Sequence, residues 1–381
     1  MIWRASAAAV ALTFCVAVPV SAAEEEASSD TTLWHDLAAV SSGSSLSSTG
    51  SSINAAAAIL EGLGSSDMEL PASSVYIPST PPPAVDPSIT VAEVVGVRAE
   101  GRLEEWSVAS PSMGRVVTVQ VFRAADAARL APMLYLLDGV ETPHPSDWMG
   151  AGRIPELMKD EQVTVVMPTG ARASMWADWY ADDPVTGRNR WETFLTEELP
   201  PLMERDVPFN GHRAIGGISM GATGALAIAN RHSDLFDATF GLSGCYSTST
   251  PLGYLSSRLT VETRGGDVDN LYGPRGDESW EHYDTQLDPS GLRDMSVYLS
   301  SARGNVDLSN DQYQNYPYEN FVVGIALEES AYHCTRELER ELRAQGTTGL
   351  RTDYAATGQH DWGNFRRYVE PAWEHIKPAL Y

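Results

Sequence analysis

The stretch GGISMGAT, residues 216–223, places Ser219 between Gly217 and Gly221 at the spacing G-x-S-x-G. A serine at this spacing can be a nucleophile on a sharp strand-to-helix turn, where the flanking glycines prevent clashes with neighbouring backbone. The motif alone does not separate such a nucleophile from an ordinary turn serine. A strand before it, a helix after it, and an acid and a histidine later in the chain would favour catalysis.

Strand-like and helix-like segments alternate on both sides of the motif. HRAIGGIS (212–219) has the composition of a short strand, and MGATGALAIANRHSDLF (220–236) that of a helix rich in small residues. WETFLTEELPPLMERD (191–206) is predicted as one helix with an apolar face. Other strand-like segments, including continuous apolar runs typical of strands buried on both faces, are residues 116–122, 132–139, 162–170, 237–244 and 295–304. This alternation predicts an α/β-hydrolase fold, a mainly parallel central sheet with helices on both faces.

A nucleophilic serine needs a base, and His360 is the best placed of the eight histidines. It stands in the glycine-punctuated loop ATGQHDWGNF (356–365), after the strand-like LRTDYAA (350–356) and before a terminal helix. In an α/β-hydrolase the chain order is serine, acid, histidine, and the base lies in a loop over the edge of the sheet. We therefore expect His360 to act on Ser219.

The acid that orients the base is harder to choose from the pattern. Carboxylates in the right part of the chain are Asp267, Asp269, Asp294, Asp307, Asp311, Glu328 and Glu329. The acid normally follows the strand predicted at residues 295–304, which favours positions from Asp307 onward. Glu328 lies near the start of a predicted long helix, and the sequence separates it only weakly from Glu329.

Composition and the amino end indicate an exported protein. A formal charge of −25, from 26 basic and 51 acidic side chains, argues against a nucleic-acid surface. Residues 1–23 have the layout of a signal peptide, and their apolar run is shorter than the roughly 20 residues of a membrane anchor. Residues 24–90 read as a Ser/Pro-rich flexible segment and residues 91–381 as the catalytic domain. We expect the protein to be secreted or held in the cell envelope.

Two cysteines, Cys245 and Cys334, remain after removal of the signal peptide. In an exported protein they invite a disulfide, and two separate buried thiols are the alternative. No cysteine or histidine spacing suggests a metal site. We expect neither a metal nor a cofactor.

Six stretches occur in an order that resembles the secreted mycolyltransferases of actinobacterial cell envelopes. They are SPSMGR (110–115), LYLLDG (134–139), WETFLTEELP (191–200), GGISMGATGALAIA (216–229), NLYGPRGDESW (270–280) and GQHDW (358–362). The resemblance spans about residues 104–378 and implies an acyltransferase with trehalose mycolate glycolipids as partners and cell-wall glycans as possible acceptors.

The same resemblance implies specific roles for residues. Ser219 would be the nucleophile, His360 the base and Glu328 the acid, with Glu329 as the close competitor. The oxyanion hole would consist of the backbone amides of Met220 and Val140.

Two further positions correspond to sugar contacts in that family, Asp138 in LLDG and Trp362 after the base. Glu141 stands where mycobacterial members often carry an arginine, so sugar binding and the acceptor can differ. A secreted carboxylesterase with the same triad and a catalytically silent surface-binding homologue are the alternatives to a mycolyltransferase.

Overall fold

The computed structural model describes residues 81–305 and 318–381 of the 381-residue chain. The predicted signal peptide and residues 24–80 of the predicted flexible segment lie outside the described residues, as do Asp307 and Asp311. Within the described residues, no helix combines the length and the apolar composition that crossing a bilayer requires.

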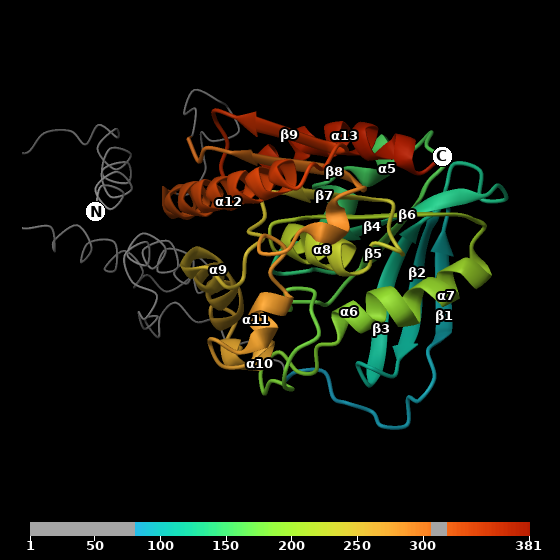
Figure 1. Ribbon diagram of the computed structural model, residues 1–381. Helices are drawn as coiled ribbons and strands as arrows, with labels where there is room; N and C mark the ends of the chain where they lie inside the picture. Colours follow the sequence, from blue (N-terminus) through green and yellow to red (C-terminus); the bar gives the residue numbers. More distant parts are fainter. Residues whose placement is uncertain (1–80, 306–317) are drawn as a thin grey trace, which may run out of the picture.

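A single nine-stranded sheet forms the centre of the fold, in the order β1-β2-β3-β5-β4-β6-β7-β8-β9 (Figure 1). The strands are β1 Glu93–Glu100, β2 Leu103–Ser110, β3 Arg115–Phe122, β4 Ala131–Leu137, β5 Thr164–Pro168, β6 Phe209–Ile218, β7 Ala238–Leu242, β8 Ser296–Ala302 and β9 Leu350–Ala355. The pairs β1–β2, β2–β3 and β3–β5 are antiparallel, and the rest of the sheet, from β5 to β9, is parallel. The carboxyl ends of the parallel strands therefore meet at one edge, where α/β proteins place their sites.

Helices cover both faces of this sheet, as the alternation of the sequence predicts. One layer contains α6 Trp191–Thr193, α7 Leu199–Asp206, α8 Met220–Arg231 and the long α12 Tyr318–Ala344; the other contains α4 Asp147–Gly150, α5 Ile154–Leu157 and α13 Trp362–Ile376. Three helices between β7 and β8 are α9 Pro251–Glu262, α10 Val268–Tyr272 and α11 Glu278–His282. The α/β-hydrolase fold is confirmed.

The two hydrophobic cores explain the continuous apolar runs. Along β4, Tyr135 and Leu137 belong to the core under α8, whereas Leu134 and Leu136 belong to the core under α13. All seven residues of β4 are buried. Because successive side chains of a strand point to opposite faces, a strand covered on both sides must be apolar at every position.

The helix predicted over residues 191–206 is interrupted. The chain runs from α6 into a π-helical turn, Phe194–Glu198, before α7 begins at Leu199. Pro200 and Pro201 lack the backbone N–H that would donate to the preceding turn, so a regular α-helical ladder cannot continue through them. The hydrogen bonds shift register instead, and the apolar side chains still reach the core.

Residues 81–90, the end of the predicted flexible segment, lie on the domain although they form no helix or strand. The amide of Asp86 donates to the carbonyl of Gly114 at 2.6 Å. A Cβ added at Gly114 would lie 2.6 Å from Val85 Cγ1, so the two segments are in close contact. Composition does not reveal this docking, because it depends on single contacts with a distant turn.

Candidate active site

Ser219 occupies the turn between β6 and α8 in an unusual backbone conformation. Its φ of 52° and ψ of −122° lie in a region that non-glycine residues rarely adopt and that costs on the order of 1–3 kcal/mol. The Ser219 amide donates to the carbonyl of Leu242 in β7 at 2.9 Å, which attaches the turn to the sheet. The strand and helix that the motif requires are therefore both present, with the serine at the carboxyl end of β6.

The glycines beside Ser219 are required by close approach of backbone. A Cβ added at Gly221 would lie 2.5 Å from the carbonyl oxygen of Asp138, and one added at Gly217 would lie 2.8 Å from that of Leu137. Neither distance is possible for a real side chain. The end of β4 therefore packs directly on the turn and brings the residues after β4 next to Ser219.

We expect Gly221→Ala to destabilise the protein by about 1–3 kcal/mol, because the added methyl must push the end of β4 away from α8. Thermal unfolding of the purified variant measures this. Gly150→Ala in α4 is the matched control, since a Cβ there meets no atom within 4 Å. If Gly221→Ala melted together with the wild type, the close packing of β4 on the turn would be wrong.

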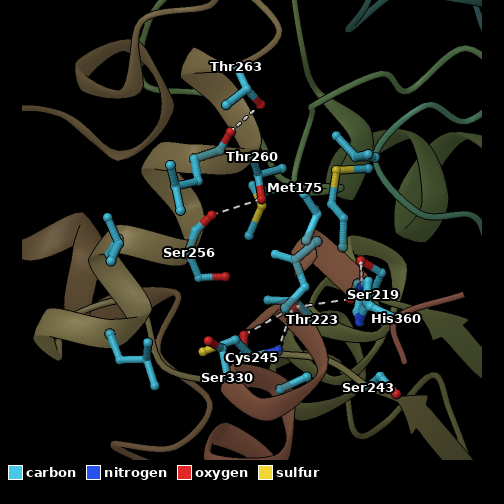
Figure 2. Close-up of a pocket in the computed structure, with 18 of the residues that line it drawn as sticks. Met175, Ser219, Thr223, Ser243, Cys245, Ser256, Thr260, Thr263, Ser330 and His360 are labelled. Atoms are coloured by element: carbon cyan, nitrogen blue, oxygen red, sulfur yellow. Dashed lines mark hydrogen bonds between the residues drawn. The ribbon is translucent and has the colours of Figure 1, made fainter. Parts of the chain in front are cut away.

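A pocket of about 140 Å³ opens over Ser219 and His360 (Figure 2). Its far wall comes from α9 and α12 and includes the apolar side chains Leu252, Leu255, Leu259, Val323 and Leu327. The hydroxyls of this wall are mostly engaged elsewhere. Thr260 donates to the Ser256 carbonyl at 2.8 Å, and Ser330 donates to the Ala326 carbonyl at 2.9 Å. The wall therefore presents chiefly methyl and methylene groups, which suit an aliphatic chain.

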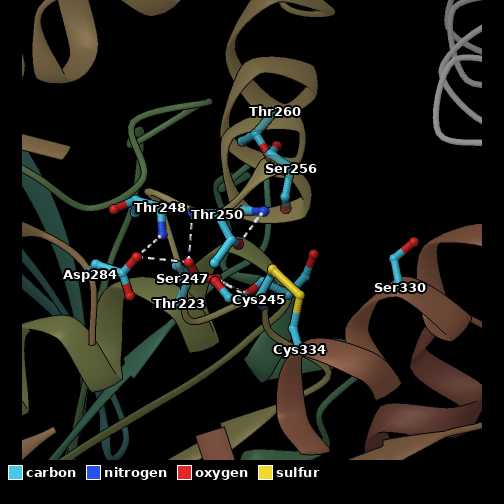
Figure 3. Close-up of a disulfide and its surroundings, with 12 residues drawn as sticks. Thr223, Cys245, Ser247, Thr248, Thr250, Ser256, Thr260, Asp284, Ser330 and Cys334 are labelled. Carbon is cyan, nitrogen blue, oxygen red and sulfur yellow. Dashed lines mark hydrogen bonds between the residues drawn. A yellow bond between two sulfur atoms is a disulfide. The ribbon is translucent and has the colours of Figure 1, made fainter. Parts of the chain in front are cut away.

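Cys245 also lines this pocket and is joined to Cys334 of α12 by a disulfide (Figure 3). Cys245 lies in the loop that follows β7, and the bridge spans a sequence separation of 89 residues. The loop after β7 and the long helix α12 are thus covalently connected at the wall of the pocket.

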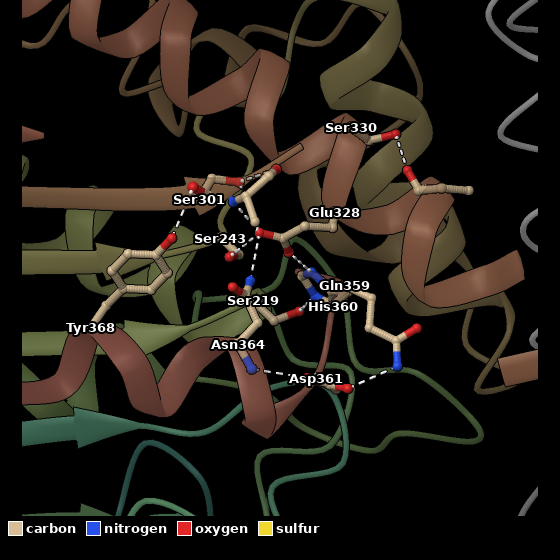
Figure 4. Close-up of polar contacts among 12 residues, drawn as sticks. Ser219, Ser243, Ser301, Glu328, Ser330, Gln359, His360, Asp361, Asn364 and Tyr368 are labelled. Atoms are coloured by element: carbon tan, nitrogen blue, oxygen red, sulfur yellow. Dashed lines mark hydrogen bonds and ion pairs between the residues drawn. The ribbon is translucent and has the colours of Figure 1, made fainter. Parts of the chain in front are cut away.

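Three side chains from distant parts of the chain form a continuous chain of hydrogen bonds (Figure 4). Ser219 Oγ lies 2.7 Å from His360 Nε2, and His360 Nδ1 lies 2.9 Å from Glu328 Oε2. Ser219 precedes α8, Glu328 is in α12, and His360 is in the loop between β9 and α13. This geometry allows the imidazole to accept the serine proton while the carboxylate orients the ring.

The other oxygen of Glu328 accepts from four groups. The donors to Oε1 are Ser243 Oγ at 2.8 Å, Ser301 Oγ at 3.0 Å, the Ala302 amide at 2.6 Å and Asn364 Nδ2 at 2.9 Å. Glu328 is completely buried, so these donors replace water and leave Oε2 to face His360. The sequence did not single out Ser243, Ser301 or Asn364. A usable signal was the position of both serines at the carboxyl ends of predicted strands.

Glu328 lies inside α12, ten residues after its start at Tyr318, rather than near the start of the helix as the sequence predicts. Its neighbour Glu329 points away from the site. Glu329 Oε1 lies 3.3 Å from His333 Nε2, one helical turn further on, and about a third of the Glu329 side chain is exposed. Of the two glutamates that the sequence left open, only Glu328 lies within hydrogen-bond distance of His360.

The loop that carries His360 is attached to α12. The His360 amide donates to the Gly324 carbonyl at 2.9 Å, and the ring packs edge-on against Phe365 with centroids 5.0 Å apart. A Cβ added at Gly324 would lie 2.8 Å from Gln359 Oε1, so a larger residue would displace the loop. The base and the acid therefore depend on the same helix for their positions.

The remaining predicted site residues fall into two groups. Val140 and Met220 line the pocket beside Ser219, whereas Asp138 and Trp362 are not among its lining residues. Trp362 is half-buried and packs edge-on against Trp148 with centroids 5.2 Å apart. Asp138 is completely buried. Within the described ranges, no three His, Cys, Asp or Glu side chains are grouped to hold a metal ion.

Burial raises the pKa of Asp138 to about 7, although the Ser146 hydroxyl and the first amides of α4 act in the opposite direction. Because the folded protein keeps this proton while the unfolded chain releases it near pH 3.8, stability is lost as the pH rises from about 4 to 7. Asp138→Asn cannot ionise. We expect the free energy of unfolding of Asp138→Asn, relative to that of the wild type, to increase by on the order of 4 kcal/mol between pH 4 and pH 7. Above pH 7 this difference should no longer change with pH.

Urea unfolding of Asp138→Asn and wild type at several pH values between 4 and 8 measures the difference. Asp160→Asn is the control, because the Asp160 side chain is 86% exposed. A stability difference between Asp138→Asn and wild type that did not vary with pH would contradict the buried, proton-holding carboxyl.

Comparison with known proteins places this site in a family. Residues 110–374 match the model of the family described as "Putative esterase". The diacylglycerol acyltransferase/mycolyltransferase Ag85A of Mycobacterium tuberculosis is 35% identical over 273 residues, which cover 68% of this chain and 76% of the relative. Ag85B of Mycolicibacterium smegmatis is 29% identical over 73% of this chain and 85% of its own.

Solved structures share the fold. The M. tuberculosis protein MPT51 (FbpC1) superposes with a TM-score of 0.62 at 24% identity, covering 74% of this chain and all of its own. An S-formylglutathione hydrolase from Agrobacterium tumefaciens gives a TM-score of 0.54 at 15% identity, covering 76% of this chain and all of its own. At these identities the likeness concerns the fold alone.

Proposed function

The chain belongs to the antigen 85-type mycolyltransferases of the esterase family, and from this premise we propose that it is a secreted serine acyltransferase. It moves mycolyl chains from trehalose monomycolate to trehalose or to cell-wall glycan acceptors through an acyl-enzyme. Ser219 is the nucleophile, His360 the base and Glu328 the acid. The observation that carries this proposal is the hydrogen-bonded chain from Ser219 through His360 to the buried Glu328, at the floor of an apolar-walled pocket.

The first half-reaction forms the acyl-enzyme. Ser219 Oγ attacks the ester carbonyl of the donor while His360 Nε2 takes its proton, and Glu328 Oε2 stabilises the imidazolium through Nδ1–H. The backbone amides of Met220 and Val140 donate to the developing oxyanion, at about 3 kcal/mol for each donor. The carbon–oxygen bond to trehalose then breaks, and the departing alkoxide takes the proton from His360.

The second half-reaction reverses these proton movements. His360 removes the proton from an acceptor hydroxyl, the acceptor oxygen attacks the acyl carbonyl, and the released Ser219 Oγ recovers a proton from His360. Transfer exceeds hydrolysis only if the acceptor is held in place and water is kept away. The apolar wall from α9 and α12 helps to keep water away, because an acyl chain bound along this wall would occupy the pocket.

The sugar side of the site is proposed from the family pattern. The pattern assigns Asp138 and Trp362 to the trehalose head group. Part of the Trp362 indole ring is available for stacking on a sugar face, whereas the completely buried Asp138 would reach the sugar only if the residues that cover it moved. Glu141 differs from the arginine that mycobacterial members often carry at this position, and it forms ion pairs with Arg172 at 3.0 Å and Arg264 at 2.6 Å. The sugar would therefore meet a different set of charges at this mouth of the pocket.

The test is a donor and acceptor assay with the purified protein and a trehalose monoester. We expect trehalose diester and free trehalose to appear together, and their formation to fall by at least about 10⁴-fold with Ser219→Ala. Release of free fatty acid without diester would identify a secreted carboxylesterase with the same triad. No reaction, together with no labelling by a fluorophosphonate, would identify a catalytically silent surface-binding homologue.

A further inference from the structure

The disulfide lies between the two parts of the fold that support the catalytic acid. We propose that the Cys245–Cys334 bridge is a positioning element of the active site, which holds the amino-terminal half of α12 so that Glu328 stays bonded to His360. This inference rests on the proposed function, because it concerns the geometry of the same triad. The bridge touches no reacting atom and acts through Glu328.

The Cys245 end of the bridge is fixed to the helix that begins after the nucleophile. The Cys245 amide donates to Thr223 Oγ1 at 3.2 Å, and Thr223 Oγ1 donates to the Cys245 carbonyl at 3.0 Å. Thr223 lies in α8, four residues after Ser219. Two residues before Cys245, Ser243 donates to Glu328. This loop is therefore hydrogen-bonded to the helix that follows the nucleophile, and it also carries Ser243, one of the donors to Glu328.

The Cys334 end lies on a helix that is anchored unevenly. In the carboxyl-terminal half of α12, Leu338 and Leu342 belong to the main hydrophobic core. Among the side chains that the structure describes in the amino-terminal half, from residue 323 onward, the buried Val323 and Ala326 form a small cluster of their own, with the partly buried Leu327 packed against it. None of the described side chains between residues 323 and 333 belongs to either of the two large cores, so this part of α12 is held less firmly than the part with Leu338 and Leu342.

Glu328 stands six residues before Cys334, which corresponds to about 9 Å along the helix axis. At that distance, a small tilt of the helix about its anchored half displaces the carboxylate by more than a hydrogen bond tolerates. The disulfide is the covalent link nearest to Glu328 among the described residues, and it opposes this tilt. The four donors to Oε1 fix the carboxylate only while the helix stays in register with β7 and β8.

The test compares wild type with Cys245→Ala/Cys334→Ala, using hydrolysis of p-nitrophenyl butyrate and the rate of labelling by a fluorophosphonate. We expect kcat and the labelling rate to fall by roughly 10- to 100-fold, as for a misplaced catalytic group, with KM changed less than about threefold. Circular dichroism at the assay temperature checks that the variant is folded. Ile154→Ala, in the core under α13, is the control for a loss of stability that does not involve α12.

Repeating the change in a Glu328→Gln background separates positioning from general loosening. If the bridge acts through Glu328, removing it should have almost no further effect on the labelling rate there. An equal fall in both backgrounds, or an unchanged kcat in the folded double variant, would overturn the proposal. Failure of the proposed function would look different: the oxidised wild type would then form no trehalose diester, and with an inactive triad it would not label either, whatever the state of the bridge.

Should the double variant fail to fold, wild type treated with a dithiol gives the same answer. The dithiol is oxidised to its cyclic disulfide as the bridge takes up two electrons and two protons to give two thiols. Activity should fall in proportion to free thiols counted by alkylation and mass spectrometry, and should return on reoxidation. Full activity in protein with both thiols alkylated would contradict the inference.

Discussion

Ser219→Ala is expected to lower formation of trehalose diester by roughly 10⁴- to 10⁶-fold, the range seen when a serine nucleophile is removed. Without the hydroxyl, His360 has no proton to accept and no acyl-enzyme can form. The backbone amides of Met220 and Val140 would remain, so a small residual rate above water is expected. The fold should be unaffected, because the hydrogen bond lost with the Ser219 hydroxyl is the one to His360.

Diester formation and fluorophosphonate labelling both report this loss. Ser290→Ala is the control, since Ser290 is exposed at a short 3₁₀ turn away from the pocket and should leave both rates within about twofold. Retention of more than a tenth of the activity in Ser219→Ala would mean that another group attacks the donor.

Glu328→Gln is expected to lower kcat by about 10³- to 10⁴-fold with little change in structure. Four donors already point at Oε1, so the amide oxygen of glutamine should take that position. The amide nitrogen then faces His360 Nδ1 and donates to it. This places the ring proton on Nε2, and a protonated Nε2 cannot accept the proton of Ser219.

Glu329→Gln is the matched control, because it makes the same chemical change one residue away. Glu329 faces His333 on the outside of α12, so we expect activity within about twofold of wild type. Steady-state kinetics of the two variants side by side distinguish the two glutamates. A large loss in Glu329→Gln with a small loss in Glu328→Gln would exchange their roles.

The sequence predicted the fold because its signals are local and repeated. Apolar runs such as that of β4 require burial on both faces, and the structure has them in the centre of the sheet. The glycines around Ser219 predicted a tight strand-to-helix turn, and the turn occurs there. Pro200 and Pro201 could have predicted an interruption of the helix at 191–206. The apolar face of this segment favoured a single continuous helix instead.

The choice between Glu328 and Glu329 depended on information that no local pattern contains. Adjacent residues of a helix point about 100° apart, and which of them faces the sheet depends on how α12 lies against β8. The donors that hold Glu328, including Ser243 and Ser301, are small polar residues of a kind common in loops. These donors surround Oε1 of Glu328 because the end of β7, the end of β8 and the start of α13 lie close together in the folded protein, and no local sequence pattern contains that information.

The role of Ser219 as the carrier of the acyl chain between donor and acceptor is tested most directly by mass spectrometry. The protein is mixed with p-nitrophenyl butyrate, an acyl donor that has no acceptor hydroxyl, quenched in acid and digested. We predict an acyl adduct on the peptide that contains Ser219, which disappears as diester forms when trehalose monoester is added in excess. An adduct confined to a peptide without Ser219, or diester formed with no adduct at any time, would contradict the mechanism.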